Sequence, residues 1–142
     1  TIGPAPDKSQ QQTAQEKIRK SYGNDTLCVA GAGMRELPDG PVSPDHIVYA
    51  KSYYLRAEPT AESVSIFEQK HGYKPHVVIF DNAVWGVGVT EKKCALAVEL
   101  ACDAAHIIHL AKAFGGVEYM TDRAREFIEN WEVESYRSKQ AE

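Results

Sequence analysis

Residues 75–116 read PHVVIFDNAVWGVGVTEKKCALAVELACDAAHIIHLAKAFGG, and this stretch decides the fold. Two of its runs, Val77–Phe80 and Val84–Val89, are rich in the β-branched residues that favour strands. The turn dipeptide Asp81-Asn82 separates the two runs. The pattern therefore predicts a tight hairpin or a strand with a sharp bend.

A long helix is predicted directly after the hairpin. Thr90 is a candidate N-cap, Glu91 suits the first turn, and Gly115-Gly116 can end a helix of about 24 residues. Apolar residues cover most of its circumference, so we expect it to be largely buried, with small alanines packed closely against a sheet. These residues are Ala95, Val98, Leu100, Ala101, Ala104, Ala105, Ile107, Ile108 and Ala111.

Shorter patterns place three elements upstream of the hairpin. Thr26–Ala30 is predicted to be a buried strand that runs into a long irregular loop of glycines and prolines. His46–Ala50 is predicted to be a second strand. Residues 60–71 are predicted to form a helix, with Thr60 as its N-cap and Gly72 at its C-terminus.

Both ends of the chain have a pattern of their own. Residues 1–24 are polar, and we expect an exposed helix or a linker there, followed by a single α/β domain over 25–142. Near the other end, Thr121 or Asp122 caps a predicted helix with one docking face. That face consists of Ala124, Phe127, Ile128, Trp131 and Ser135.

Taken together, these elements predict an α/β fold. We expect a mixed sheet of about four strands, packed by the long buried helix and flanked by the helix over 60–71 and the C-terminal helix.

Composition excludes several classes of protein. The chain has 142 residues, 43% of them hydrophobic, and 16 Lys plus Arg against 20 Asp plus Glu, a net charge of -4. Nucleic acids and anionic membranes select basic surfaces, so we expect neither as a partner. The polar residues at the N-terminus do not resemble a signal peptide, and we expect a cytoplasmic location. The three cysteines form no CxxC pair, and we interpret Cys94 and Cys102 as core residues. Because Thr1 is not a methionine, we also expect a fragment or a separately made domain.

Two weak motifs have competing interpretations. His106 and His109 share a helix face, as two metal ligands would, but the pair lacks a third ligand and fits a helix edge or subunit contact better. Gly31-Ala-Gly33 could cradle a phosphate, but prolines follow it instead of a helix, and we favour a mobile loop.

Two clusters are better candidates for chemistry. Asp45 and His46 adjoin at the start of a predicted strand, with Lys51 five residues on, and could act as acid and base or orient an anion. Their structural alternative is a turn cap beside a partly buried histidine. Asn82 and Trp85 could form a polar turn with an aromatic platform for a sugar, although a tryptophan between strands is more often part of a core.

The order of these features resembles the C-terminal domain of large class II aldolase/adducin-like proteins, including the rhamnulose-phosphate aldolase type sometimes fused to a short-chain dehydrogenase. The resemblance covers roughly residues 25–140. It rests on five blocks, which are GPVSPDHIVY (40–49), PHVVIF (75–80), VWGVG (84–88), AFGG (113–116) and ENWE (129–132).

The resemblance implies a class II aldolase-like layered domain and a role in carbohydrate metabolism. Aldolases of the family hold a divalent metal, usually zinc, through histidines that include an HxH pair and a later His-Gly. This chain has no HxH, and Asn82-Ala83 stands where His-Gly is expected. We therefore expect no cofactor in this chain, with the zinc or other divalent metal in a companion aldolase domain or chain.

Three functions remain open at this stage. In the first, the chain is the accessory, non-metal domain of a sugar-phosphate aldolase, a carbon–carbon lyase. It then contributes catalytic Asp45 and His46, and Lys51, Asn82 and Trp85 bind a sugar or sugar phosphate. In the second, it is a non-catalytic oligomerisation or interaction module, as in adducin, and we expect a homo-oligomer. In the third, it is a free-standing enzyme that uses Asp45 and His46 without a metal.

Overall fold

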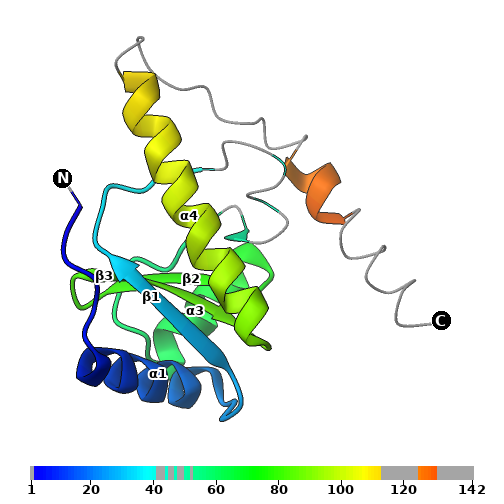
Figure 1. The fold of residues 1–142 in the computed structure, drawn as a ribbon. Coiled ribbons are helices and arrows are strands. Elements are labelled where there is room, and N and C mark those ends of the chain that lie inside the picture. The colour runs from blue at the N-terminus through cyan, green and yellow to red at the C-terminus, as the bar shows by residue number, and fades with distance from the viewer. Residues whose placement is uncertain are drawn as a thin grey trace.

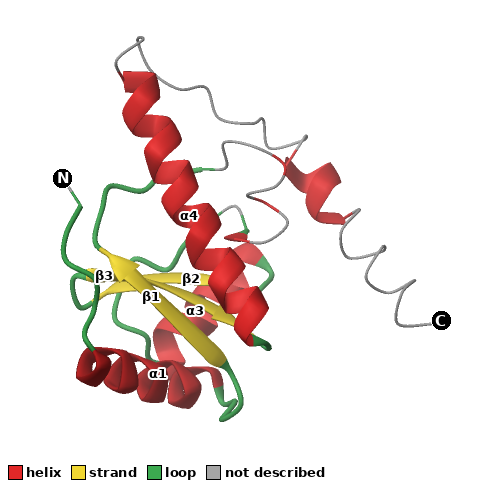
Figure 2. Ribbon diagram, viewed as in Figure 1, coloured by secondary structure: helices red, strands yellow, loops and turns green. Residues whose placement is uncertain are grey.

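The computed structural model describes residues 2–40, 44, 47, 50, 51, 53–112 and 125–130. Helices and strands alternate along most of this part of the chain (Figures 1 and 2). In chain order they are α1 (Lys8–Tyr22), β1 (Cys28–Gly33), α3 (Ala61–His71), β2 (Val77–Phe80), β3 (Ala83–Gly88) and α4 (Glu91–Lys112), and residues 125–130 are also helical.

The predicted hairpin is confirmed. Strands β2 and β3 pair antiparallel, with Phe80 opposite Ala83, so that only Asp81 and Asn82 lie in the turn. Both turn residues have positive φ, 51° and 56°, which is the backbone of the two-residue turns that fit the twist of a hairpin. Asp and Asn tolerate this conformation better than most residues.

The sheet has three antiparallel strands in the described part of the chain, in the order β1-β3-β2. Helices cover both faces of this sheet. Residues of α1 and α3 pack on one face in a cluster that contains Ile18, Phe67 and Trp85. Residues of α4 pack on the other face in a cluster that contains Val84 and Ala101. The α/β fold is therefore a three-layer arrangement, with the sheet in the middle (Figure 1).

Helix α4 starts as predicted. The Thr90 side chain accepts a hydrogen bond from the backbone N–H of Lys93 at 3.1 Å, which caps the first turn. The backbone of α4 lies almost directly on β3, because a Cβ added to Gly86 would lie only 2.3 Å from the carbonyl oxygen of Cys94. Glycine in the middle strand thus lets the helix approach the sheet closely.

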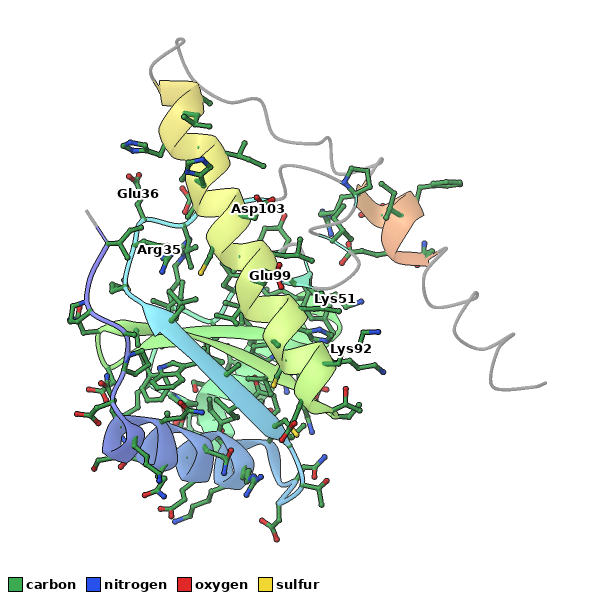
Figure 3. The ribbon with its side chains drawn as sticks, in the orientation of Figure 1. Arg35, Glu36, Lys51, Lys92, Glu99 and Asp103 are labelled. Carbon is green, nitrogen blue, oxygen red and sulfur yellow. The ribbon has the colours of Figure 1, made fainter. Side chains whose placement is uncertain are left out.

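The expected burial of α4 on most sides is wrong. Its buried residues form one stripe, whereas Ala95 is exposed and the Leu110 side chain is 49% exposed. Lys92, Glu99 and Asp103 are exposed on α4 as well (Figure 3). The sheet covers only one side of the helix, so an all-round apolar composition does not lead to all-round burial. The buried stripe consists of Cys94, Ala97, Val98, Ala101, Ala104, Ala105 and Ile108.

Helix α1 resolves the choice between helix and linker at the N-terminus. Asp7 caps its first turn, and Gly23, at a φ of 69°, ends it. Its few apolar residues are buried, with Ile18 completely enclosed. At its last residue the Tyr22 hydroxyl donates a hydrogen bond of 2.5 Å to the carbonyl oxygen of Pro75. The segment is therefore a packed part of the fold.

The strand predicted over His46–Ala50 is wrong. Ile47 and Ala50 have helical backbone, and the N–H of Lys51 donates to the carbonyl of Ile47 at 3.2 Å. Both apolar residues are fully buried. A short, continuously apolar run such as IVYA at 47–50 fits a buried helix as well as a buried strand, which explains the error. The edge of β2 is instead met by Leu55, through a single parallel bridge to Val78.

The C-terminal predictions are only partly covered by the described residues. Residues 125–130 are helical, but the caps Thr121 and Asp122 and the predicted end of α4 at Gly115-Gly116 lie outside the described part. Phe127, predicted on the docking face, is 71% exposed. The helical segment at 125–130 instead forms one wall of the pocket described next.

Candidate functional site

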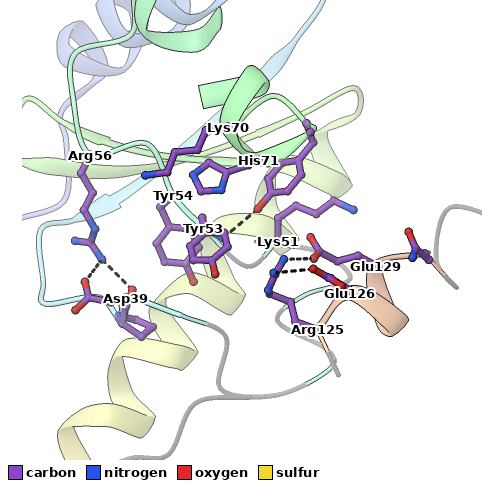
Figure 4. A pocket seen from close by; sticks show the side chains of 14 residues that line it. Asp39, Lys51, Tyr53, Tyr54, Arg56, Lys70, His71, Arg125, Glu126 and Glu129 are labelled. Carbon is purple, nitrogen blue, oxygen red and sulfur yellow. Dashed lines mark hydrogen bonds and ion pairs between the residues drawn. The ribbon is translucent and has the colours of Figure 1, made fainter. Parts of the chain in front are cut away.

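A pocket of about 860 Å³ lies at the C-terminal end of α3 (Figure 4). Four parts of the chain meet there. They are Pro38-Asp39, the segment around Lys51–Arg56, the turn that ends α3, and the helical residues 125–130. Its lining is Pro38, Asp39, Lys51, Tyr53, Tyr54, Arg56, Lys70, His71, Gly72, Tyr73, Arg125, Glu126, Glu129 and Asn130.

Stacked aromatic rings form one wall. The rings of Tyr53 and His71 are stacked with centroids 4.6 Å apart. The ring centroid of Phe67 lies 4.4 Å from that of His71. The Tyr73 hydroxyl accepts a hydrogen bond of 3.2 Å from the backbone N–H of Tyr53. Gly72, at a φ of 85°, ends α3 in the left-handed conformation and sets His71 and Tyr73 on either side of the turn.

Basic side chains approach these rings from two sides. The Lys51 ammonium lies 5.9 Å from the ring centroid of Tyr73, and the Arg125 guanidinium lies 5.4 Å from that of Tyr53. Both distances are in the range of cation–π attraction. Lys70 lines the same pocket from the last turn of α3.

Arg56 is held at the opposite side of the pocket (Figure 4). It donates hydrogen bonds to the carbonyl oxygens of Leu37 (3.2 Å) and Pro38 (2.9 Å), and lies 3.7 Å from the Asp39 carboxylate. These contacts fix the direction of the guanidinium. Arginine in a fixed orientation suits planar anions such as carboxylates and phosphates.

Acidic side chains neutralise part of this charge. Arg125 forms a 2.6 Å ion pair with Glu129 and lies 3.8 Å from Glu126. The pocket thus combines the cations Lys51, Arg56, Lys70 and Arg125 with the carboxylates Asp39, Glu126 and Glu129. Such a mixture offers donors and acceptors to a polyhydroxylated ligand and leaves a small excess of positive charge.

The pKa shifts report the same electrostatic environment. Burial lowers the pKa of His71, and the nearby cations Lys70 and Arg125 lower it further. Burial raises the pKa of Tyr54 to about 12, and it also raises that of Tyr73. At neutral pH the pocket therefore presents a neutral imidazole and protonated phenols, all able to hydrogen-bond a ligand.

Of the predicted site residues that the structure describes, one lies at the pocket and two do not. Lys51 lines the pocket. Asn82 lies in the turn between β2 and β3, and Trp85 is completely buried between the sheet and α1, donating a hydrogen bond of 3.2 Å to the carbonyl of Phe80. Neither lines the pocket. Asp45 and His46 lie outside the described residues.

Most pocket residues were missed by the sequence analysis. The signal was the density of aromatic and basic residues in two short stretches, KSYYLR at 51–56 and KHGY at 70–73. Neither stretch matches a catalytic motif, and only the folded chain brings them together with Arg125.

The motif Gly31-Ala-Gly33 has a structural role. Gly31 and Gly33 are part of β1 and do not form a loop, so the expected mobile loop is wrong there. A Cβ on Gly31 would lie 2.4 Å from the Trp85 ring, and one on Gly33 would lie 2.1 Å from the carbonyl oxygen of Gly3. Both glycines are thus required by close packing.

Helix α4 carries two histidines and is apolar over most of its length. His106 and His109 are exposed on α4, and the described residues include no group of three His, Cys, Asp or Glu that could hold a metal. By length and composition, Glu91–Ala111 could span a membrane, but its buried stripe packs on the sheet, as in the core helix of many soluble proteins.

No protein-family model matches the chain, and no curated protein sequence matches it significantly.

Proposed function

We propose that the chain is the accessory, non-metal domain of a class II aldolase-like protein of carbohydrate metabolism and binds a sugar phosphate in the pocket at the end of α3. The observation that supports it is the lining of this pocket, where Lys51, Arg56 and Lys70 surround stacked aromatic rings. The class of protein is proposed from the sequence resemblance, and sugar-phosphate binding is proposed from the lining of the pocket.

The two halves of a sugar phosphate need different partners, and this pocket offers both. The phosphate is a dianion that pairs with ammonium and guanidinium groups, as at Lys70 and Arg56. The sugar stacks its apolar C–H face on aromatic rings and donates hydroxyl protons to carboxylates, as at Tyr53 and Asp39. In this proposal the divalent metal and the carbon–carbon bond cleavage belong to the companion aldolase domain.

Calorimetric titration with L-rhamnulose 1-phosphate tests this function, with L-rhamnose and inorganic phosphate as reference ligands. We expect the sugar phosphate to bind more tightly than either reference, because only it engages both halves of the pocket. The substitution Lys70→Gln should weaken its binding roughly ten- to a hundredfold, since a charge-assisted contact contributes about 1.5–3 kcal/mol.

Lys20→Gln is the matched control, because Lys20 is an exposed lysine in the last turn of α1, the position that Lys70 has in α3. It should bind the sugar phosphate like the natural sequence. Equal affinity of the Lys70 and Lys20 variants, or no preference for the phosphorylated sugar, would contradict the proposal.

A second candidate function rests on the exposed side of α4. Val89 and Leu110 are large apolar residues that are 61% and 49% exposed, near the two ends of this helix. An adducin-type module for oligomerisation or interaction would use such a surface. Analytical ultracentrifugation of the chain over a range of concentrations distinguishes the sugar-phosphate-binding domain from the oligomerisation module. A stable homo-oligomer without sugar-phosphate binding favours the module.

A further inference from the structure

The two cysteines Cys28 and Cys94 lie on the same side of the sheet, and neither lines the pocket. Side chains alternate along β1, and Ala30 and Ala32 of this strand pack on the α4 face. Cys28 is two residues before Ala30, so its side chain lies on the same face of the strand, toward α4. Cys94 lies in the first turns of α4, where it is only 3% exposed.

Gly88 brings these two cysteines close together. It is the direct partner of Cys28 across the β1–β3 ladder. A Cβ added to Gly88 would lie 2.6 Å from the backbone nitrogen of Cys94. Opposed residues in antiparallel strands have Cβ atoms about 5 Å apart. The first turns of α4 therefore rest on the glycine beside Cys28, so Cys94 lies next to the strand position that Cys28 occupies.

The orientation and electrostatics of the thiols agree with this placement. The Cys94 thiol donates to the carbonyl of Glu91 at 3.2 Å, so its sulfur points back toward the start of α4, the end that lies over Gly88. The pKa of Cys94 is raised mainly by burial and also by the charge of the Cys28 thiolate. Cys102, eight residues further along α4, is about 12 Å away along the helix axis.

We propose that Cys28 and Cys94 form a redox-active dithiol that closes to an intramolecular disulfide when a peroxide oxidises it. Cys28, which is partly exposed, attacks a peroxide oxygen as its thiolate, giving a sulfenic acid and hydroxide. The Cys94 sulfur then attacks the Cys28 sulfur and loses its proton, and water leaves. One hydrogen peroxide is reduced to two waters, and two thiols become one disulfide.

The disulfide would tie the edge strand β1 to the start of α4. In a reducing compartment such a bond is transient and reports oxidising conditions. Neither cysteine lines the pocket, so this inference does not depend on the proposed function.

Mass spectrometry of the full chain tests this dithiol. The folded protein is treated with hydrogen peroxide and its remaining thiols are alkylated. Trypsin leaves Cys94 and Cys102 on one peptide, 94–112, so the non-reduced protein is digested with trypsin and Glu-C, which cuts after Glu99 between the two cysteines, and the peptides are mapped. We expect a loss of two hydrogen masses, one alkylated cysteine at Cys102, and a peptide pair that joins Cys28 to Cys94. Reduction with dithiothreitol should restore three alkylated cysteines.

Three controls make the result decisive. Cys102→Ser should keep the disulfide, whereas Cys94→Ser should lose it. The unfolded protein in urea should form mixed pairs, because the fold no longer selects one. Three free thiols after treatment of the natural sequence, over-oxidation without a disulfide, or a pair that contains Cys102 would each overturn the proposal, whether or not the serine variants fold.

Discussion

At the scale of single residues, Gly86 is tightly constrained by its contact with α4. A Cβ at this position would lie 2.3 Å from the carbonyl oxygen of Cys94 and 2.7 Å from the backbone nitrogen of Val98. Both neighbours are helix backbone, which cannot move aside as a flexible side chain can. The position therefore requires glycine because of space.

Gly86→Ala should lower the free energy of unfolding by about 3 kcal/mol, the upper part of the range for overpacked cores. Urea unfolding followed by circular dichroism measures this loss. Ala95→Ser, an exposed change on the same helix, serves as the control and should stay within about 0.5 kcal/mol. Two equal midpoints would show that α4 can shift away from the sheet at little cost.

At the scale of elements, α3 carries the pocket residues Lys70 and His71, and its start is fixed by a capping box. The Thr60 hydroxyl accepts from the N–H of Ser63 at 3.0 Å, and the Ser63 hydroxyl accepts from the N–H of Thr60 at 2.9 Å. Two backbone donors that the helix leaves open are thereby satisfied.

Thr60→Ala should therefore destabilise the domain by about 1 kcal/mol, the usual effect of losing an N-cap side chain. Thr60→Ser keeps the hydroxyl and should recover most of this stability, which separates the cap from other effects of the position. Thermal unfolding of the three proteins provides the comparison. If the alanine and serine variants melted together, the cap would have no measurable role.

Elements that depend on local signals were predictable from the sequence. The hairpin follows from Asp81-Asn82, and α3 follows from the capping residues Thr60 and Gly72, because turns and caps have short-range chemical rules. Ile47 and Ala50 were misassigned because a short, continuously apolar run fits a buried helix as well as a buried strand. The pocket was beyond reach, since it depends on Arg125 meeting Tyr53 across more than half of the chain.

At the scale of the whole molecule, α1 decides where the folded unit begins. Most of its residues are polar, but three of them, Ala14, Ile18 and Tyr22, are buried. They complete the cluster on the α1 and α3 face of the sheet that also encloses Trp85. One narrow buried stripe is enough to make a polar helix part of a core.

Ile18→Ala tests this role of α1. It removes a fully enclosed side chain, so the free energy of unfolding should fall by about 2–5 kcal/mol, as for other large-to-small changes in cores. Gln12→Ala, an exposed change on the same helix, should have an effect below about 0.5 kcal/mol. Chemical denaturation monitored by tryptophan fluorescence is suited to the measurement, because Trp85 lies in the same cluster as Ile18. A linker that only precedes the domain would give two variants of equal stability, and the folded unit would then begin after residue 24.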